Sequence, residues 1–193
     1  MHAIGERMNL YMVERLGIKR EEVSKTRENF LKTYGTTLNA LRRYYSIDPD
    51  EFLDFVHDIP LERHLRYEAA LDRMLESLDL RKIIFTNADA KHARRVLAHL
   101  GISRHFESIV DIHMLEFVNK PFRRAYLKTL AFTSSRPEEC ILIDDLPVNI
   151  SPARELGMTT VIVGNDAHYD GAHYHIESIT DFRDLYVQKI AVS

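Results

Sequence analysis

The sequence has few of the residues and patterns that mark specialised protein classes. Its 193 residues include a single cysteine, Cys140, which excludes an internal disulfide framework and fits a reducing cytoplasm. Seven glycines and six prolines are too few for low-complexity sequence. No apolar run approaches the ~20 residues of a membrane span, and the opening residues do not read as a signal peptide. We therefore expect a cytoplasmic protein.

The chain also lacks an excess of charge of either sign. Its 26 basic and 29 acidic side chains leave a net charge of −3, which does not indicate nucleic acid or a membrane surface as a partner. Hydrophobic residues make up 45% and charged residues 28%, an ordinary globular composition. A chain of this size buries enough surface to be stable without disulfides or structural metals.

The first third of the sequence is predicted to be helical. Apolar residues recur every four positions from Ile4 to Leu16, which lines one face of a helix before Gly17 ends it. A polar helix over 21–34 should end at Gly35, and Thr36 or Thr37 can cap a short helix after it. Asp48, followed by proline and two acids, predicts the start of another helix.

After residue 61 short apolar strands alternate with helices, which is typical of a parallel sheet covered on both faces. The strands are predicted at 83–85, 109–112, 140–143 and 159–163, and the helices at 67–78, 91–100, 122–130 and 149–156. We therefore predict an α/β fold with two parts. Residues 1–63 form a helical cap with its entry linker, and residues 64–193 form a Rossmann-like core.

Polar residues stand at the ends of the predicted strands, where ligands bind in open parallel sheets. Thr86 and Asn87 follow the first strand, and a hydroxyl with exposed backbone N–H groups suits a phosphate. Asp144 and Asp145 follow the third strand, and two adjacent carboxylates suit a hard cation such as Mg²⁺. Lys120 precedes the helix between them and can neutralise a phosphoryl oxygen. Together these residues predict a phosphate and magnesium site.

These motifs, in this order, resemble motifs two, three and four of the haloacid dehalogenase-like phosphatases. Two further segments resemble the helical cap of the subgroup that includes the pyrimidine 5′-nucleotidases. The core motifs are Ile84-Phe85-Thr86-Asn87-Ala88, Asn119-Lys120-Pro121, and Ile143-Asp144-Asp145 with Asn149 and Gly157-Met158; the cap segments are Tyr34-Gly35-Thr36-Thr37 and Phe55-Val56-His57-Asp58.

The resemblance implies a role for each matching residue. Thr86 would hydrogen-bond a phosphoryl oxygen, with the backbone N–H of Asn87 beside it. Lys120 would hold the nucleophile and the phosphate together. Asp144 would ligate Mg²⁺, and Asp145 would support it directly or through water. The resemblance further implies a small phosphorylated substrate, such as a nucleotide, under a cap that excludes water.

One motif of the family is missing from the sequence. The family begins with a strand that ends in Asp-x-Asp-x-Thr, whose first Asp is the nucleophile and whose second is the general acid/base. By the resemblance, Met1 falls in the linker after that strand. The only Asp-x-Asp in the chain, Asp48-Pro49-Asp50, stands at a predicted helix start and is not expected to replace it.

In this fold the missing strand lies at the centre of the sheet, between the strands that end at Phe85 and Ile143. Losing three or four buried aliphatic side chains forfeits roughly 5 to 12 kcal/mol. Three outcomes are open: the flanking strands pair directly, another segment fills the position, or the chain is not the whole natural protein. A second copy of the chain that covers the exposed strand edges is a related possibility.

Two functions follow from these observations. The first is a Mg²⁺-dependent phosphomonoester hydrolase of the nucleotidase type, with little or no turnover by the chain as it stands. The alternative is a pseudo-phosphatase that binds a phosphorylated ligand or a protein without chemistry. His57 and Asp58, at a predicted helix end, are open to two interpretations, as substrate contacts from the cap or as structural residues.

Overall fold

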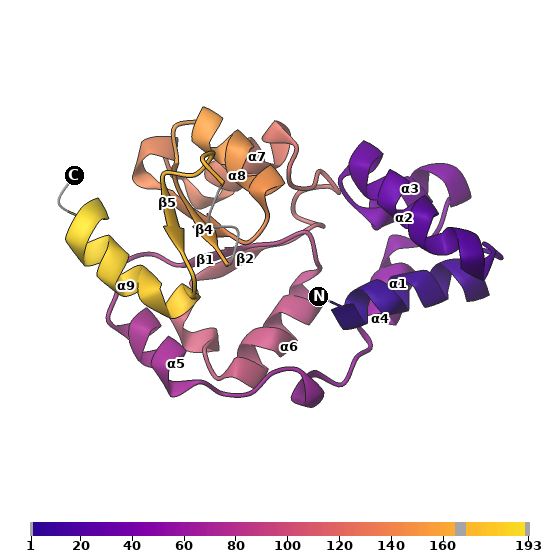
Figure 1. Ribbon diagram of the computed structural model, residues 1–193, viewed down its shortest axis with the longest axis horizontal. Helices are drawn as coiled ribbons and strands as arrows, with labels where there is room; N and C mark the ends of the chain where they lie inside the picture. Colours follow the sequence, from indigo (N-terminus) through magenta and orange to yellow (C-terminus); the bar gives the residue numbers. More distant parts are fainter. Residues whose placement is uncertain (1, 165–168, 192–193) are drawn as a thin grey trace.

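The structure is a computed structural model, and it describes residues 2–164 and 169–191. Four helices form the N-terminal part of the chain and lie together at one end of the molecule (Figure 1). They are α1 (His2–Glu14), α2 (Arg20–Tyr34), α3 (Thr37–Tyr45) and α4 (Pro49–His57). Tyr11, Met12 and Phe52 are among the buried side chains of their common hydrophobic cluster.

The predicted helix boundaries in this part are confirmed. Gly35 ends α2 in the left-handed conformation, with φ of 73°, and its N–H donates to Leu31 O. Of the two threonines, Thr36 is the cap, because its hydroxyl accepts from Asn39 N at 3.2 Å. Asp48 caps α4 by accepting from Asp50 N at 2.8 Å. The Asp-x-Asp sequence is therefore a helix start.

The rest of the described chain alternates strands and helices. Its strands are β1 (Ile83–Phe85), β2 (Ser108–Val110), β3 (Ile141–Asp144), β4 (Thr159–Val163) and β5 (Tyr174–Ile176). Its α-helices are α5 (Ala69–Glu76), α6 (Ala90–Leu100), α7 (Arg123–Thr133), α8 (Pro147–Glu155) and α9 (Phe182–Leu185), and α9 continues into a π-helical turn, Tyr186–Ile190. Short 3₁₀ turns lie at Leu61–Arg63, Ser103–His105, Pro137–Glu139 and Ile179–Asp181. Across the described ranges, no helix combines the length and apolarity needed to cross a membrane.

Among the residues that the structure describes, all strand pairs are parallel, as the alternation predicts, and the strands form two separate sheets. One has the order β1-β2, with Phe85 opposite Val110, and the other has the order β3-β4-β5, with Asp144 opposite Ile162. The second strand was predicted too long: it ends at Val110, and Ile112 packs against the cap cluster instead. The strand β5 was not predicted, because Tyr-His-Ile is too short to stand out.

Helices cover both faces of these sheets (Figure 1). Side chains of α7 and α8, such as Tyr126 and Ile150, pack on one face in a cluster that includes Leu142. Side chains of α5, α6 and α9, such as Leu75, pack on the other in a cluster that includes Val161. The core is therefore α/β with a layer of helices on each side of parallel strands, which confirms the predicted fold class.

The strands β1 and β3 do not pair with each other, and no described strand pairs with both. Nevertheless their side chains enter the same two clusters. Phe85 and Leu142 contribute to one cluster, and Ile84 and Ile143 to the other. Although β1 is wholly apolar, all three of its residues are only half-buried, whereas Val161 in the central strand β4 is fully buried. The two sheets thus share their hydrophobic layers, and β1 and β3 each keep one edge without a described strand partner.

Candidate active site

An ion pair between Lys120 and Asp144 lies at the carboxyl end of β3. Lys120 Nζ is 2.7 Å from Asp144 Oδ2, and the two side chains are 11% and 6% exposed. The ammonium also lies 4.9 Å from the centre of the Phe85 ring. Because both charges are largely removed from water, their attraction is stronger than at the surface. The structure therefore brings Lys120 and Asp144 together at the carboxyl end of β3.

The other oxygen of Asp144 is also held. Asp144 Oδ1 accepts from Leu146 N at 3.0 Å and from Asn149 Nδ2 at 2.9 Å. Asn149 is buried in α8, which begins at Pro147, two residues after Asp145. These bonds fix the carboxylate, and they explain why Asn149 accompanies the aspartate pair in the sequence.

Asn87 fixes the backbone of Lys120. Its Oδ1 accepts from Lys120 N at 2.8 Å, and its Nδ2 donates to Lys120 O at 3.0 Å. The sequence implies only that the backbone N–H of Asn87 lies beside the phosphate. It does not indicate that the Asn87 side chain hydrogen-bonds the backbone of Lys120. These two hydrogen bonds join the end of β1 to the turn before α7 at Lys120.

Thr86 follows β1 and stands beside this pair of turns. Its N–H donates to Val110 O at 3.0 Å, which continues the pairing of β1 with β2, and its Oγ1 accepts from Ala88 N at 3.0 Å. Within the described residues no acceptor is found for its own hydroxyl proton, so Thr86 is suited to donate to an anion.

Asp145 is exposed, whereas the side chain of the adjacent Asp144 is only 6% exposed. No group of three or more His, Cys, Asp or Glu side chains suited to a metal occurs among the described residues. Mg²⁺ commonly binds through one or two carboxylates, with water and substrate phosphate as its other ligands. The two adjacent aspartates fit that partial donor set, although both oxygens of Asp144 already have protein partners.

The fully buried Asn119 links this site to the cap and was not assigned a role from the sequence. Its Nδ2 donates to Lys120 O at 2.6 Å, and its Oδ1 accepts from Asn39 Nδ2 of α3 at 2.5 Å. A Cβ added at Gly35 would lie 2.3 Å from Asn119 Nδ2, so only glycine permits this approach of cap and core. In the sequence, the only indication of this contact is Gly35, which precedes Thr36 and Thr37.

Tyr126 of α7 hydrogen-bonds α8, the helix that carries Asn149. The Tyr126 side chain is 1% exposed, and its hydroxyl donates to Asn149 O at 2.7 Å. Burial and the nearby charge of Asp144 raise the pKa of Tyr126. The phenol therefore stays protonated and holds α8 in register with α7.

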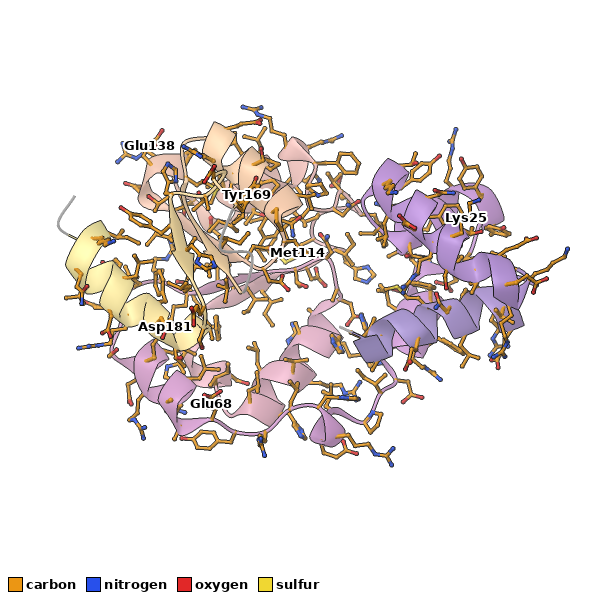
Figure 2. All side chains as sticks on the ribbon, in the orientation of Figure 1. Lys25, Glu68, Met114, Glu138, Tyr169 and Asp181 are labelled. Atoms are coloured by element: carbon orange, nitrogen blue, oxygen red, sulfur yellow. The ribbon has the colours of Figure 1, made fainter. Side chains whose placement is uncertain are left out.

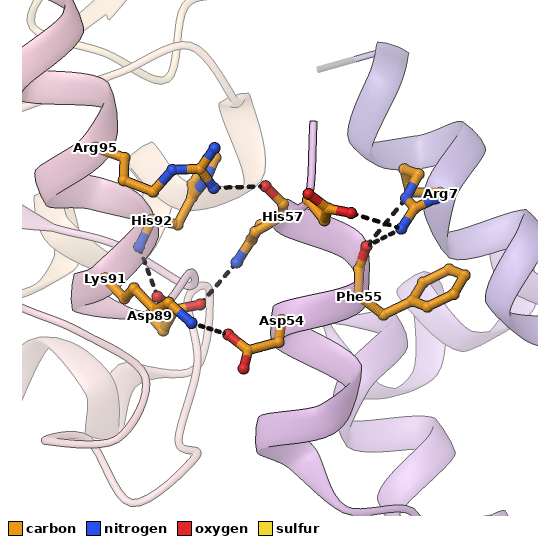
Figure 3. A pocket seen from close by; sticks show the side chains of 9 residues that line it. Arg7, Asp54, Phe55, His57, Asp89, Lys91, His92 and Arg95 are labelled. Atoms are coloured by element: carbon orange, nitrogen blue, oxygen red, sulfur yellow. Dashed lines mark hydrogen bonds and ion pairs between the residues drawn. The ribbon is translucent and has the colours of Figure 1, made fainter. Parts of the chain in front are cut away.

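A cavity between the N-terminal helices and α6 lies away from Lys120. It has a volume of about 450 Å³ and lies between α1, α4 and α6 (Figure 3). Residues that line it include Arg7 of α1, His57 of α4, Asp89 at the N-cap of α6, and His92 and Arg95 within α6. Cap and core thus meet here as well as at Asn119.

Comparison with known proteins identifies the family. The sequence model for haloacid dehalogenase-like hydrolases matches residues 8–163, which is most of the chain and includes every residue of the Lys120 site. The protein belongs to the haloacid dehalogenase-like hydrolases. The match begins in α1 and ends with β4, so the family relationship covers both the helical N-terminal part and the strand-containing part.

Curated relatives of this family member match over shorter segments. The rat bifunctional epoxide hydrolase 2 (Rattus norvegicus) is 30% identical over 81 residues, 41% of this chain and 14% of the relative. The mouse protein of the same name (Mus musculus) is 32% identical over 66 residues, 34% of this chain and 12% of the relative. The chain therefore matches only a small part of these longer proteins.

Solved structures show the same fold at low sequence identity. β-Phosphoglucomutase from Clostridium difficile is 22% identical, with a TM-score of 0.67 over 97% of this chain and 89% of that one. A phosphatase of the family from Thermococcus onnurineus is 17% identical, with a TM-score of 0.61 over 93% and 86%. L-2-haloacid dehalogenase from Xanthobacter autotrophicus is 13% identical, with a TM-score of 0.60 over 81% and 76%.

Proposed function

We propose that the chain forms the cap and most of the core of a Mg²⁺-dependent phosphomonoester hydrolase. The observation that carries this proposal is the buried Lys120–Asp144 pair, which stands beside Thr86 and an exposed second carboxylate at Asp145. A buried ammonium with a nearby hydroxyl donor suits the oxygens of a phosphoryl group. Two adjacent carboxylates suit a divalent cation that compensates their repulsion.

Each residue then has a defined task. Lys120 holds a phosphoryl oxygen and the incoming nucleophile, and Thr86 donates its hydroxyl proton to a second phosphoryl oxygen. Asp144 and Asp145 are the ligands that the chain offers to Mg²⁺. When bound, this ion supplies Lewis-acid stabilisation of the charge on the phosphoryl oxygens. Asn87, Asn149 and Tyr126 keep these groups in place.

The nucleophile belongs to a segment that the described residues do not contain. Within the described residues, Asp144 is the carboxylate that pairs with Lys120, whereas Asp48 is the N-cap of α4 and Asp50 lies in its first turn. We propose that a strand ending in Asp-x-Asp stands between β1 and β3 in the active enzyme. The 193-residue chain by itself then has little or no turnover.

The proposed substrate class is the nucleoside 5′-monophosphates, with pyrimidine nucleotides preferred. Support comes from the cap segments that resemble the pyrimidine 5′-nucleotidases, of which Gly35 and Thr36 lie where the cap meets Asn119. In this proposal residues 1–63 act as the cap and residues 64–193 as the core. Closure of the cap excludes water from the phosphoryl group, and the enzyme works in the cytoplasm.

The test uses a form extended at its N-terminus by a strand that ends in Asp-x-Asp. Phosphate release is measured with and without Mg²⁺ on UMP, CMP, AMP, glucose 1-phosphate and p-nitrophenyl phosphate, and chloride release is measured on 2-chloropropionate. We expect Mg²⁺-dependent phosphate release, highest with UMP and CMP. Turnover of 2-chloropropionate alone would make the protein a dehalogenase, and no turnover of any compound would favour the pseudo-phosphatase.

A further inference from the structure

A buried contact between two histidines and an aspartate joins the last cap helix to the core. His57 Nδ1 lies 2.7 Å from Asp89 Oδ2, and their side chains are 8% and 11% exposed. His57 is the last residue of α4, and Asp89 is the N-cap of α6, where its Oδ1 accepts from His92 N at 2.6 Å. One carboxylate thus caps a core helix and bonds a cap side chain (Figure 3).

His92 completes this contact by stacking. Its ring lies 4.0 Å from the ring of His57, centroid to centroid, with 13° between the planes. His92 is 8% exposed, and its Nδ1 is buried without a hydrogen-bond partner in the described structure. A buried polar atom without a partner is costly, so this arrangement is not the one that stability alone would favour.

The pKa values of His92 and Asp89 are both lowered in this contact. Burial and the neighbouring His57 lower the pKa of His92 to about 4, so His92 is neutral near pH 7. Burial would raise the pKa of Asp89, but hydrogen bonds from His57 and His92 N–H lower it to about 2. The charged groups that face this contact are Arg7 of α1, Asp54 and Asp58 of α4, and Lys91 and Arg95 of α6.

Several of these outer groups also bridge cap and core. Lys91 Nζ lies 2.5 Å from Asp54 Oδ1, and Arg95 Nη1 donates to His57 O at 2.9 Å. The Lys91–Asp54 pair is more than 60% exposed at both ends and is worth little by itself. The buried contact of His57, Asp89 and His92 is therefore the firm part of this junction.

The junction lies next to the phosphate-binding turn. Asp89 is two residues after Asn87, whose side chain fixes Lys120, and three after Thr86. The intervening Ala88 donates to Thr86 Oγ1 and accepts from Ile112 N at 3.1 Å. A displacement of α4 that pulls on Asp89 acts on a short, hydrogen-bonded segment that ends at the proposed site.

We propose that His57, Asp89 and His92 are positioning residues that set the orientation of the cap relative to the Thr86–Asn87 turn. This inference rests on the proposed function, in which the cap closes over that turn. The aspartate holds α4 through His57, and the stacked ring of His92 keeps the imidazole of His57 aimed at the carboxylate. Loss of either partner frees the cap to sample other orientations without unfolding it.

The test measures the distance between cap and core without any substrate. Spin labels are placed on cysteines introduced at Lys25 in α2 and Glu138 before β3, with Cys140 replaced by serine. The labelled chain is diluted with unlabelled chain, so that only distances within one chain are measured. Figure 2 shows these two exposed positions on cap and core. Asp89→Ser keeps the N-cap of α6 but is too short to reach His57. We expect its distance distribution to broaden and gain a longer component, while the parent distribution stays narrow.

Two further variants separate positioning from structure. Asp48→Ser makes the same change at the exposed N-cap of α4 and should leave the distribution narrow. His92→Phe keeps a stacked ring, so its distance distribution should stay narrow, whereas that of His92→Ala should broaden. His92→Ala serves as the test if Asp89→Ser does not fold. Narrow distributions in folded Asp89→Ser and His92→Ala would overturn the proposal. Because no substrate is used, this result is independent of phosphate release.

Discussion

At the scale of single residues, the proposed chemistry depends on a cation whose backbone and side chain are both fixed. Lys120 is held by Asn87 through its backbone, and by Asp144 through its ammonium. The sequence predicts a site from Thr86, Asn87, Asp144 and Asp145, which follow apolar runs, and from Lys120, which opens the helix between those strands. It could not predict that the amide of Asn87 bridges to Lys120, because that contact joins residues 33 positions apart.

Replacement of Lys120 tests its role in the extended form. Lys120→Met removes the ammonium that stabilises charge on the phosphoryl oxygens, so we expect a loss in kcat of about 10²- to 10³-fold. Steady-state phosphate release measures it. Lys128→Met is the matched control on α7, because Lys128 pairs with Glu116 and touches no residue of the site. Equal activity of Lys120→Met and Lys128→Met would contradict the role of Lys120.

The stability of the chain should fall in weak acid because of His92. Its pKa is about 4 in the folded chain against about 6.5 in the unfolded one, so the unfolded chain binds more protons between these values. The free energy of unfolding therefore decreases as the pH falls from about 6.5 to 4. Asp89, with a folded pKa of about 2, adds a second loss at still lower pH.

Urea denaturation at a series of pH values measures this decrease. His92→Phe has no group to titrate and should show a flatter dependence between pH 6.5 and 4, with Asp89 still contributing below that range. A variant that loses stability as steeply as the parent in this range would show that other groups are responsible.

At the scale of elements, the sequence predicted most helices because their ends carry strong signals. Gly35 and Gly101 end α2 and α6 in the left-handed conformation, and Asp48 caps α4. Short strands were harder to predict. The three residues of β5 carry no period, and its pairing with β4 depends on residues distant in the sequence.

Gly35 tests the close approach of cap and core. Gly35→Ala places a Cβ 2.3 Å from Asn119 Nδ2 and adds backbone strain at φ of 73°. Gly17→Ala adds similar strain at φ of 67° with nothing within 4 Å, and should cost about 1–2 kcal/mol. We expect Gly35→Ala to lower the free energy of unfolding further than Gly17→Ala. Equal losses in the free energy of unfolding would show that the contact between Gly35 and Asn119 does not contribute to the stability of the chain.

Tyr126 tests the support between α7 and α8. Tyr126→Phe removes the donor to the carbonyl of Asn149, so we expect a loss of about 1 kcal/mol in the free energy of unfolding. Chemical denaturation measures it. Tyr45→Phe, at an exposed side chain of α3, should stay within about 0.5 kcal/mol of the parent. If Tyr126→Phe had the same free energy of unfolding as the parent, another donor would have replaced the hydroxyl.

At the scale of the whole molecule, two parallel sheets share their hydrophobic layers but not their hydrogen bonds. The sequence located the break between the strands that end at Phe85 and Ile143, since the resemblance implies a strand there. Direct pairing of these strands, one of the three open outcomes, is not what the structure has. Nor does another described segment fill the position.

Unpaired apolar strand edges are templates for association. We therefore expect the 193-residue chain to form a homo-oligomer that covers the edges of β1 and β3, and the form extended by a strand to be monomeric. Light scattering coupled to size exclusion measures both masses. A monomeric 193-residue chain at the highest soluble concentration would contradict this expectation.

The most direct test of the proposed function compares turnover of the 193-residue chain with that of the extended form. Phosphate release from UMP is measured for both at saturating Mg²⁺, with a second extended form whose first strand aspartate is replaced by asparagine. Only the extended form with both aspartates should release phosphate at an appreciable rate. Equal turnover by the 193-residue chain would contradict the proposal that the nucleophile belongs to a strand between β1 and β3.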